Sequence, residues 1–180
     1  MNDDKEYPFY TITLVPFRES DCKTLFDIRN EESIRKGMLN QAPVAWESHQ
    51  QWVTNNLINP KNVHLFLIHH KGDIAGFSLL KKLPDRQFEL GVILKEKFLK
   101  TRVAFLAAIA TGKYSFEELG GESLLSNVPR ANLTALNFNQ RMGLEIYHTD
   151  EKYFYLKADK NIYQHDLVKP QLKKPNKKPG

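Results

Sequence analysis

The chain opens with a strand-like alternation of polar and apolar residues and continues with short helical patterns. Residues 10–15 alternate as a half-buried strand does, and Pro16 follows them. Apolar residues then recur at helical spacing in short stretches separated by loop-like residues. The expected helices are 20–30, 31–38 and 48–59. This part of the chain therefore predicts one strand followed by two or three helices.

The rest of the chain alternates strand patterns with two longer helical patterns. The turn sequence 71–73 separates two apolar runs and predicts a hairpin. Gly120 and Gly121 end the longest helical periodicity. The expected strands are 64–69, 74–81, 88–94, 123–128 and a pair within 146–156, and the expected helices are 103–119 and 132–142.

This order of elements predicts a mixed α/β fold, with one sheet and helices on both faces. The length of 180 residues and the hydrophobic content of 41% suit one domain with a sizeable core. We place this domain over residues 10–158. Residues 1–9 are then an N-terminal extension, and residues 159–180 are a C-terminal tail.

The net charge of +5 comes from the tail. From Lys160 onward the chain has six lysines against Asp166, so residues 1–159 carry no net charge. The Lys- and Pro-rich tail is expected to be disordered. A neutral core argues against a nucleic-acid-binding domain. The tail could contact RNA or anionic lipid, but a solubilising or incidental tail is the favoured interpretation.

The sequence predicts neither secretion, nor a membrane span, nor a metal site. No apolar run approaches the ~20 residues that cross a bilayer, and the first residues are too polar for a signal peptide. The single cysteine, Cys22, excludes an internal disulfide and suits a reducing compartment, so we expect a cytoplasmic protein. No cluster of His, Cys, Asp and Glu has the spacing of metal ligands.

The most informative stretch begins at Glu89. A short apolar strand with one carboxylate leads through a basic link, residues 95–102, into a helix that starts near Val103. Unpaired backbone amides and the helix dipole make such a start a natural phosphate site. The stretch therefore indicates a phosphorylated cofactor, with Glu89 as a candidate base beside it.

Three segments in this order resemble the GNAT superfamily of acyl-CoA-dependent N-acetyltransferases. They are residues 25–52, with Arg29-Asn30 and Trp46 to Trp52; residues 74–94, with Ile74-Ala75-Gly76 and Glu89 to Leu94; and residues 132–144, from Asn132 to Leu144. The resemblance covers roughly residues 10–158 and is nearest to members that acetylate nucleotide-linked amino sugars or ribosomal proteins. It implies a mostly antiparallel sheet whose central parallel pair is formed by residues 88–94 and 123–128.

The resemblance implies an enzyme that binds acetyl-CoA in a V-shaped opening between those two strands. Backbone groups of Val92, Ile93 and Leu94 would pair with the pantetheine arm, and Asn132 would bond to it or cap its own helix. Glu89 would take the proton of the attacking amine, directly or through water. The amides that would hold the pyrophosphate belong to Lys100, Thr101, Arg102, Val103 and Ala104.

Two features depart from the family pattern. The phosphate loop usually reads Arg/Gln-x-x-Gly-x-Gly/Ala, whereas Lys100 and Arg102 stand here in place of glycines and Ala104 fits. Either these cations contact phosphate directly, or the cofactor site is degenerate. Phe138 replaces a tyrosine that protonates the leaving thiolate in many members. Tyr147, Tyr153 and water remain open as substitutes.

The expected acceptor is a primary amine. The candidate acceptor contacts are Arg29, Asn30, Trp46 and His49, and each also has a simple structural interpretation as a cap, a core residue or a surface residue. A nucleotide-linked amino sugar is the first candidate acceptor, and a protein or peptide amine is the second. The third alternative is a binding or regulatory module that has lost catalysis. The sequence leaves homodimer formation open.

Overall fold

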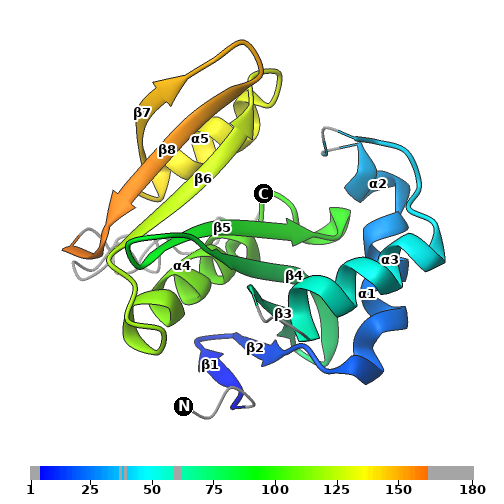
Figure 1. Cartoon of the computed structure of the whole chain (residues 1–180). Helices are drawn as coiled ribbons and strands as arrows, with labels where there is room; N and C mark the ends of the chain where they lie inside the picture. Colours follow the sequence, from blue (N-terminus) through cyan, green and yellow to red (C-terminus); the bar gives the residue numbers. More distant parts are fainter. Residues whose placement is uncertain (1–4, 37, 39, 59–61, 162–180) are drawn as a thin grey trace, which may run out of the picture.

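Eight strands form one mixed sheet in the computed structural model, which describes residues 5–36, 38, 40–58 and 62–161. Their order across the sheet is β1-β2-β3-β4-β5-β6-β8-β7. The neighbours β5 and β6 are parallel, and the other neighbouring pairs are antiparallel. The strands are β1 Tyr7–Phe9, β2 Ile12–Pro16, β3 Val63–His70, β4 Asp73–Lys82, β5 Gln87–Leu94, β6 Ser123–Pro129, β7 Glu145–Thr149 and β8 Tyr153–Asp159 (Figure 1).

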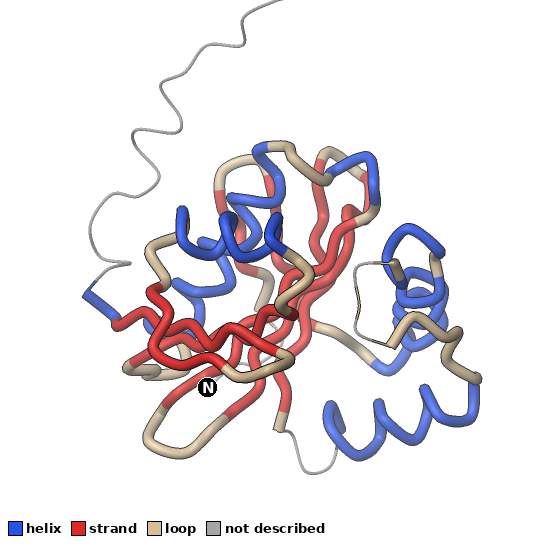
Figure 2. The backbone as a smooth tube through the Cα atoms, turned by 90° about the horizontal axis from the view of Figure 1, so that it is seen from above, coloured by secondary structure: helices blue, strands red, loops and turns tan. Residues whose placement is uncertain are grey.

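Helices cover both faces of this sheet, as Figure 2 shows from above. α1, α2 and α3 lie together on one face, and α4 and α5 lie on the other. A π-helical turn, Thr54–Ile58, continues α3. The α-helices are α1 Cys22–Asn30, α2 Glu32–Arg35, α3 Trp46–Val53, α4 Arg102–Glu117 and α5 Leu133–Arg141.

The alternation of side chains along the strands produces two separate cores. On β3, Leu65 and Leu67 face α1–α3, whereas Phe66 and Ile68 face α4. α4 is buried over most of its surface because it crosses the middle of the sheet. Its buried Thr111 hydroxyl is hydrogen bonded to Ser78 Oγ and to the Ala107 carbonyl, both at 2.8 Å. The buried hydroxyl therefore has hydrogen-bond partners inside the larger core.

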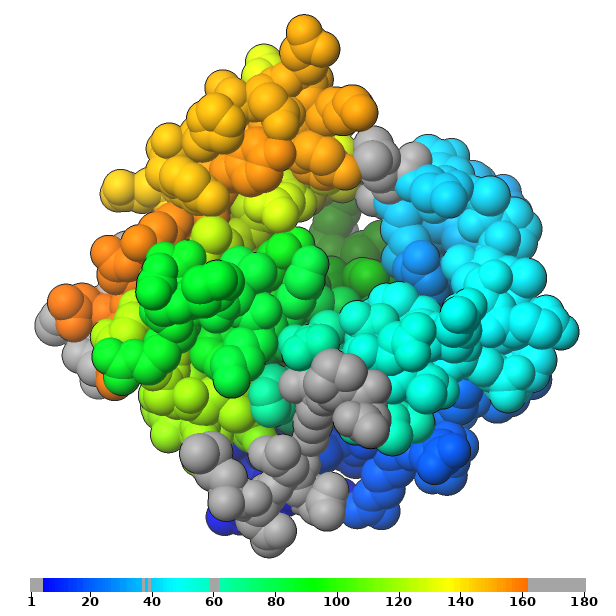
Figure 3. Space-filling model, in the orientation of Figure 1, coloured from blue at the N-terminus to red at the C-terminus, as the bar shows by residue number. Residues whose placement is uncertain are grey.

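β5 and β6 separate after a short paired segment. Their parallel register ends at Glu89↔Leu125. Beyond that point β5 stays paired with β4 as far as Leu94, and β6 stays paired with β8 as far as Pro129. Figure 3 shows the surface hollowed between the green β5, the yellow-green β6 and the blue-to-cyan N-terminal helices. The predicted opening between the two parallel strands is therefore present.

The predicted elements agree with the structure, and most differences lie at their ends. β1 lies within residues 1–9, which the sequence analysis treats as an extension, and its Tyr7 packs edge-on against Tyr114 of α4 (ring centroids 5.6 Å apart). α3 begins at Trp46 rather than at Ser48, with Ala45 as its N-cap. The predicted start of the tail at residue 159 is wrong, because Asp159 still pairs with Ser123 in β8. Residues 162–180 lie outside the described part of the chain, so disorder there stays a prediction. Within the described ranges, no helix is both long and apolar enough to cross a membrane.

Candidate functional site

Glu89 lies at the point where the two parallel strands part. Its neighbours Phe88 and Leu90 are buried against α4, so the Glu89 side chain belongs to the opposite face, which α1–α3 partly cover. The residue is partly exposed, and Lys81 of β4 lies directly across from it. The candidate base is therefore accessible from the opening.

Past Glu89, β5 has a strand partner on one side only, which is β4. Val92 packs towards α4, and Ile93 packs towards α1–α3. The backbone groups on the other edge of β5 therefore face the opening. An extended ligand can pair with such an edge as another strand would. This geometry suits the predicted pantetheine contacts at Val92, Ile93 and Leu94.

The start of α4 uses some of its amides within the protein. Thr101 is the N-cap, and its Oγ1 accepts from the Val103 amide (3.2 Å) and donates to the Phe98 carbonyl (2.6 Å). The Thr101 amide also donates to the Phe98 carbonyl (3.4 Å). Two of the five predicted amide donors are thus engaged. The amides of Lys100 and Ala104 and the cationic side chains are the better candidates for a pyrophosphate.

Lys100 adopts a backbone conformation that favours glycine. Its φ is +58°, in the left-handed region, where a side chain costs roughly 1 kcal/mol. Arg102 differs, because it is the first residue of α4. The chain thus keeps a glycine-like backbone at Lys100 and tolerates the strain. A cation held in this way at a helix start is well placed for a phosphate.

Replacing Arg102 with alanine is expected to weaken acetyl-CoA binding. A charge-assisted hydrogen bond to phosphate contributes about 1.5–3 kcal/mol, so the Kd should rise about 10-fold or more in a calorimetric titration. Lys97→Ala is the matched control, because Lys97 lies in the same basic link but before the start of α4, where it pairs with Asp73 (2.7 Å). Equal effects of the two variants would contradict a specific phosphate contact at Arg102.

Replacing Lys100 with glycine is expected to stabilise the fold and to weaken cofactor binding. Relief of the strain gains about 1 kcal/mol, and the greater freedom of glycine in the unfolded chain removes about half of that. Lys71→Gly is the control, since Lys71 also has a positive φ (+51°) but lies in the β3–β4 turn. Denaturant unfolding should show a higher free energy of unfolding for both variants. Only Lys100→Gly should raise the Kd for acetyl-CoA. A loss of stability in Lys100→Gly would contradict the strain argument.

The helix after β6 holds two of the sequence-predicted positions. Asn132 caps α5, because its Oδ1 accepts from the Ala135 amide (3.0 Å). This confirms the predicted cap, while its contact with pantetheine stays a prediction. Phe138 packs against the larger core. The Tyr155 hydroxyl donates to Asp150 (2.7 Å), which raises the pKa of Tyr155, so this neighbour of Tyr147 and Tyr153 is a poor proton donor.

A cavity of about 370 Å³ lies between α1–α3 and the sheet. Leu79 and Ile93 form part of its floor and come from β4 and β5. Leu79 lies opposite Gly91, which is two residues from Glu89 on the same face, or about 7 Å along the strand. The residues that line the cavity are Leu25, Arg29, Val44, Ser48, His49, Trp52, Leu65, Phe77, Leu79 and Ile93.

Arg29 and His49, two of the four predicted acceptor contacts, line this cavity. The guanidinium of Arg29 donates to the sulfur of Met38 (3.1 Å), and burial lowers its pKa. His49 is 1% exposed, and its Nε2 lies 3.0 Å from the Cys22 carbonyl. Burial lowers the pKa of His49, the bond to Cys22 opposes this effect, and the charge of Arg29 adds to it. His49 is therefore a neutral imidazole at pH 7.

The other two, Asn30 and Trp46, are outside the cavity lining and hold the loop before α3. Asn30 exchanges hydrogen bonds with the backbone of Val44 (2.8 and 3.1 Å). Trp46 packs edge-on against Phe26 (ring centroids 5.0 Å apart). Ser48 and Trp52 also line the cavity, although the sequence analysis did not include them among the acceptor contacts. Ser48 and Trp52 are four residues apart, so they lie on one face of a helix. This spacing is the sequence signal that could have identified them.

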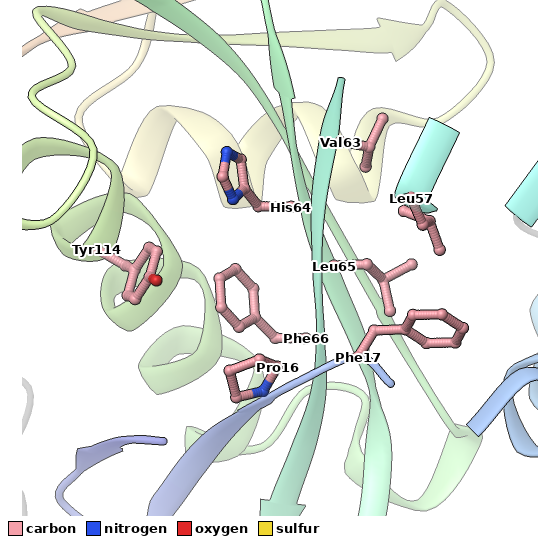
Figure 4. Close-up of a pocket in the computed structure, with 8 residues that line it drawn as sticks. All are labelled: Pro16, Phe17, Leu57, Val63, His64, Leu65, Phe66 and Tyr114. Atoms are coloured by element: carbon pink, nitrogen blue, oxygen red, sulfur yellow. The ribbon is translucent and has the colours of Figure 1, made fainter. Parts of the chain in front are cut away.

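A second cavity, of about 40 Å³, lies where β2 ends beside β3. In Figure 4 His64, Phe66 and Tyr114 lie on one side of β3, and Leu65 and Phe17 lie on the other. It has room for a few water molecules and is too small for a cofactor or acceptor. Within the part of the chain that the structure describes, no group of three or more His, Cys, Asp and Glu residues could hold a metal ion.

Comparisons with solved structures place this fold among acetyltransferases. One is apo FdhC, a nucleotide-linked sugar GNAT, with a TM-score of 0.77 and 21% identity over 93% of this chain and 97% of that one. Another is spermidine N-acetyltransferase from Vibrio cholerae with CoA and spermine, with a TM-score of 0.76 and 15% identity over 86% and 99%. A third is an aminoglycoside acetyltransferase in complex with coenzyme A, with a TM-score of 0.75 and 12% identity over 86% and 98%.

These identities are low, so the likeness shows the fold and confirms the predicted architecture. No curated protein sequence matches the chain significantly. A family model matches residues 11–145, which is most of the predicted domain, and its description is "Acetyltransferase (GNAT) domain". The chain therefore belongs to the GNAT acetyltransferase family.

Proposed function

We propose that the protein transfers an acetyl group from acetyl-CoA to a primary amine of a small molecule bound in the cavity beside Glu89. One observation carries this proposal: Glu89 lies where β5 and β6 separate, on the same face of the sheet as the cavity. Membership of the family confirms the predicted enzyme class and its acetyl-CoA donor. The acceptor and the roles of single residues are the proposed part.

The residues around the opening fit acetyl-CoA. The edge of β5 beyond Glu89 offers backbone groups to the pantetheine arm, and the basic loop at the start of α4 offers cations to the pyrophosphate. When bound, acetyl-CoA supplies a thioester-activated acetyl group. The chain's own contribution is then to orient the amine, remove its proton and stabilise the developing charge.

Glu89 accepts the proton of the amine in this proposal. A protonated amine has no lone pair, so a base must act before or during the attack. The cavity floor at Leu79 is about 7 Å along the sheet from Glu89, a span that the Glu89 side chain and one bound water can cover. This supports Glu89 as the base, directly or through water.

Position 138 would offer no acid to the departing thiolate of CoA. Phe138 has no proton to give, and Tyr147 on β7 and Tyr153 on β8 stay candidates for this role. A thiol with a pKa of ~8.5 could leave as the unprotonated thiolate and take its proton from water. The absence of this acid is therefore compatible with activity.

The size of the cavity supports a small-molecule acceptor over a peptide. Its volume of about 370 Å³ falls within the ~300–1,000 Å³ of small-molecule sites. A nucleotide-linked amino sugar is the first candidate, and the similarity in fold to a nucleotide-linked sugar GNAT favours it. A peptide amine is the second candidate, and a non-catalytic binding module is the third.

The test is a titration of the full-length protein with acetyl-CoA, followed by an amine screen that records release of the CoA thiol. We expect micromolar binding and turnover with a small primary amine. Turnover with peptides alone would favour the second candidate. No binding even at millimolar acetyl-CoA would overturn the enzymatic proposal and leave the binding module.

A further inference from the structure

Arg29 is the one formally charged residue in the lining of the large cavity, within the described ranges. The other polar members of the lining are Ser48 and His49, and the rest are apolar. His49 is neutral, because burial and the charge of Arg29 lower its pKa. The cavity therefore presents a single positive charge on an apolar background.

The carboxylates nearest to Arg29 in sequence are paired with other cations. Asp27 pairs with Lys23, Glu31 with Lys95 (3.7 Å) and Glu32 with Lys36 (2.8 Å). Within the part of the chain that the structure describes, the hydrogen bond of the Arg29 guanidinium goes to the sulfur of Met38, a weak acceptor. A partly buried guanidinium without an anionic partner is costly for the fold. Arg29 is therefore suited to a partner that arrives with a ligand.

His49 adds a second polar group to the same cavity. Its buried Nε2 lies 3.0 Å from the Cys22 carbonyl, and a carbonyl accepts, so Nε2 carries the proton. The other ring nitrogen, Nδ1, is then an acceptor with a lone pair. An anionic ligand in the cavity would give Arg29 the charged partner that the described residues do not supply.

We infer that the acceptor amine carries a phosphate or carboxylate group, and that Arg29 binds this group in the cavity while the amine lies near Glu89. The inference rests on the proposed function. Arginine binds either anion through a planar fork of donors, and the interaction strengthens where water is excluded. A polycationic amine such as spermidine would instead place a positive charge against Arg29. The site therefore selects for acidic amines and against polyamines.

The test compares amine acceptors that differ in charge. The panel is glucosamine, glucosamine 6-phosphate, muramic acid, a nucleotide-linked amino sugar and spermidine, each assayed for kcat and KM. We expect the anionic acceptors to exceed glucosamine at least about 10-fold in kcat/KM, and spermidine to be poorest. The phosphate and carboxylate members show which anion is preferred. Equal kcat/KM for neutral and anionic acceptors would overturn the inference.

Arg29→Gln should remove this preference by raising KM for the anionic acceptors, with kcat and the Kd of acetyl-CoA unchanged. Arg29→Lys keeps the charge without the planar fork of donors. Its KM for the anionic acceptors should therefore lie between those of the parent protein and Arg29→Gln. The control is Arg141→Gln, an exposed position on α5. Since Arg29 has no carboxylate partner within the described ranges, the melting temperature of Arg29→Gln should be unchanged or raised. A similar loss of kcat/KM for neutral and anionic acceptors in Arg29→Gln would contradict the inference.

A binding experiment separates failure of this inference from failure of the proposed function. Glucosamine 6-phosphate is titrated into the protein without acetyl-CoA, beside glucosamine at the same concentrations. If glucosamine 6-phosphate binds, glucosamine does not, and Arg29→Gln abolishes the binding, the anion site is supported even without turnover of any acceptor. Acetyl transfer without any preference for the anion keeps the proposed function and overturns the role of Arg29.

Discussion

Glu89→Gln is expected to lower kcat about 100- to 1,000-fold, as loss of a general base does. The variant keeps the size and hydrogen-bonding capacity of the side chain but cannot accept a proton at neutral pH. Glu89 is partly exposed at the end of the β5–β6 pairing, so the fold does not depend on its charge. The Kd of acetyl-CoA and the melting temperature should therefore stay as in the parent protein.

The pH dependence provides a second measurement on the same variant. Without Glu89 the amine must lose its proton to solvent, so the rate should rise more steeply with pH than in the parent protein. Glu151→Gln, at an exposed position in the β7–β8 turn, is the matched control and should leave both kcat and its pH profile unchanged. Retention of kcat in Glu89→Gln within a few-fold would show that another group, or water alone, removes the proton.

Gly76→Ala is expected to destabilise the fold by about 3 kcal/mol, at the upper end for an added methyl group. A Cβ at this position would lie 2.1 Å from the Ile93 carbonyl oxygen and 2.8 Å from the Leu94 Cα. Both atoms belong to the backbone of β5, so no side-chain rotation can relieve the clash. β5 itself must move, and it carries the proposed pantetheine contacts. The Kd of acetyl-CoA should therefore rise together with the loss of stability.

Gly72→Ala separates this contact from the general cost of losing a glycine. Gly72 has a φ of +86°, but no atom lies within 4 Å of its added Cβ. Strain alone should cost about 1 kcal/mol there, with no effect on acetyl-CoA binding. Denaturant unfolding of the two variants, with a cofactor titration of each, tests the argument. Similar losses in both would show that the close approach of β4 to β5 is unimportant.

Most helices and strands, and the Asn132 cap, were predictable because their signals are local. Alternation and helical spacing placed β2 to β6 and α1, α4 and α5 close to their observed ends, and they predicted β7 and β8 as a pair without separate ends. Asn132 was recognisable as a cap from its position before an apolar helix, and it caps α5. The candidate base at Glu89 and the basic loop before α4 were also visible, since both follow directly from the order strand, cationic link and helix.

The tertiary structure decided what surrounds those residues. No local pattern distinguishes Arg29, which lines the cavity, from Asn30, which holds the Val44 loop, since the difference depends on contacts between distant segments. The sequence predicted residues 1–9 as an extension, whereas β1 pairs with β2 at the edge of the sheet and its Tyr7 packs against Tyr114. The sequence by itself therefore determined the element types and the family resemblance, because these depend on periodicity and spacing. Folding alone determined which side chains meet at the site, because burial and pairing are long-range properties.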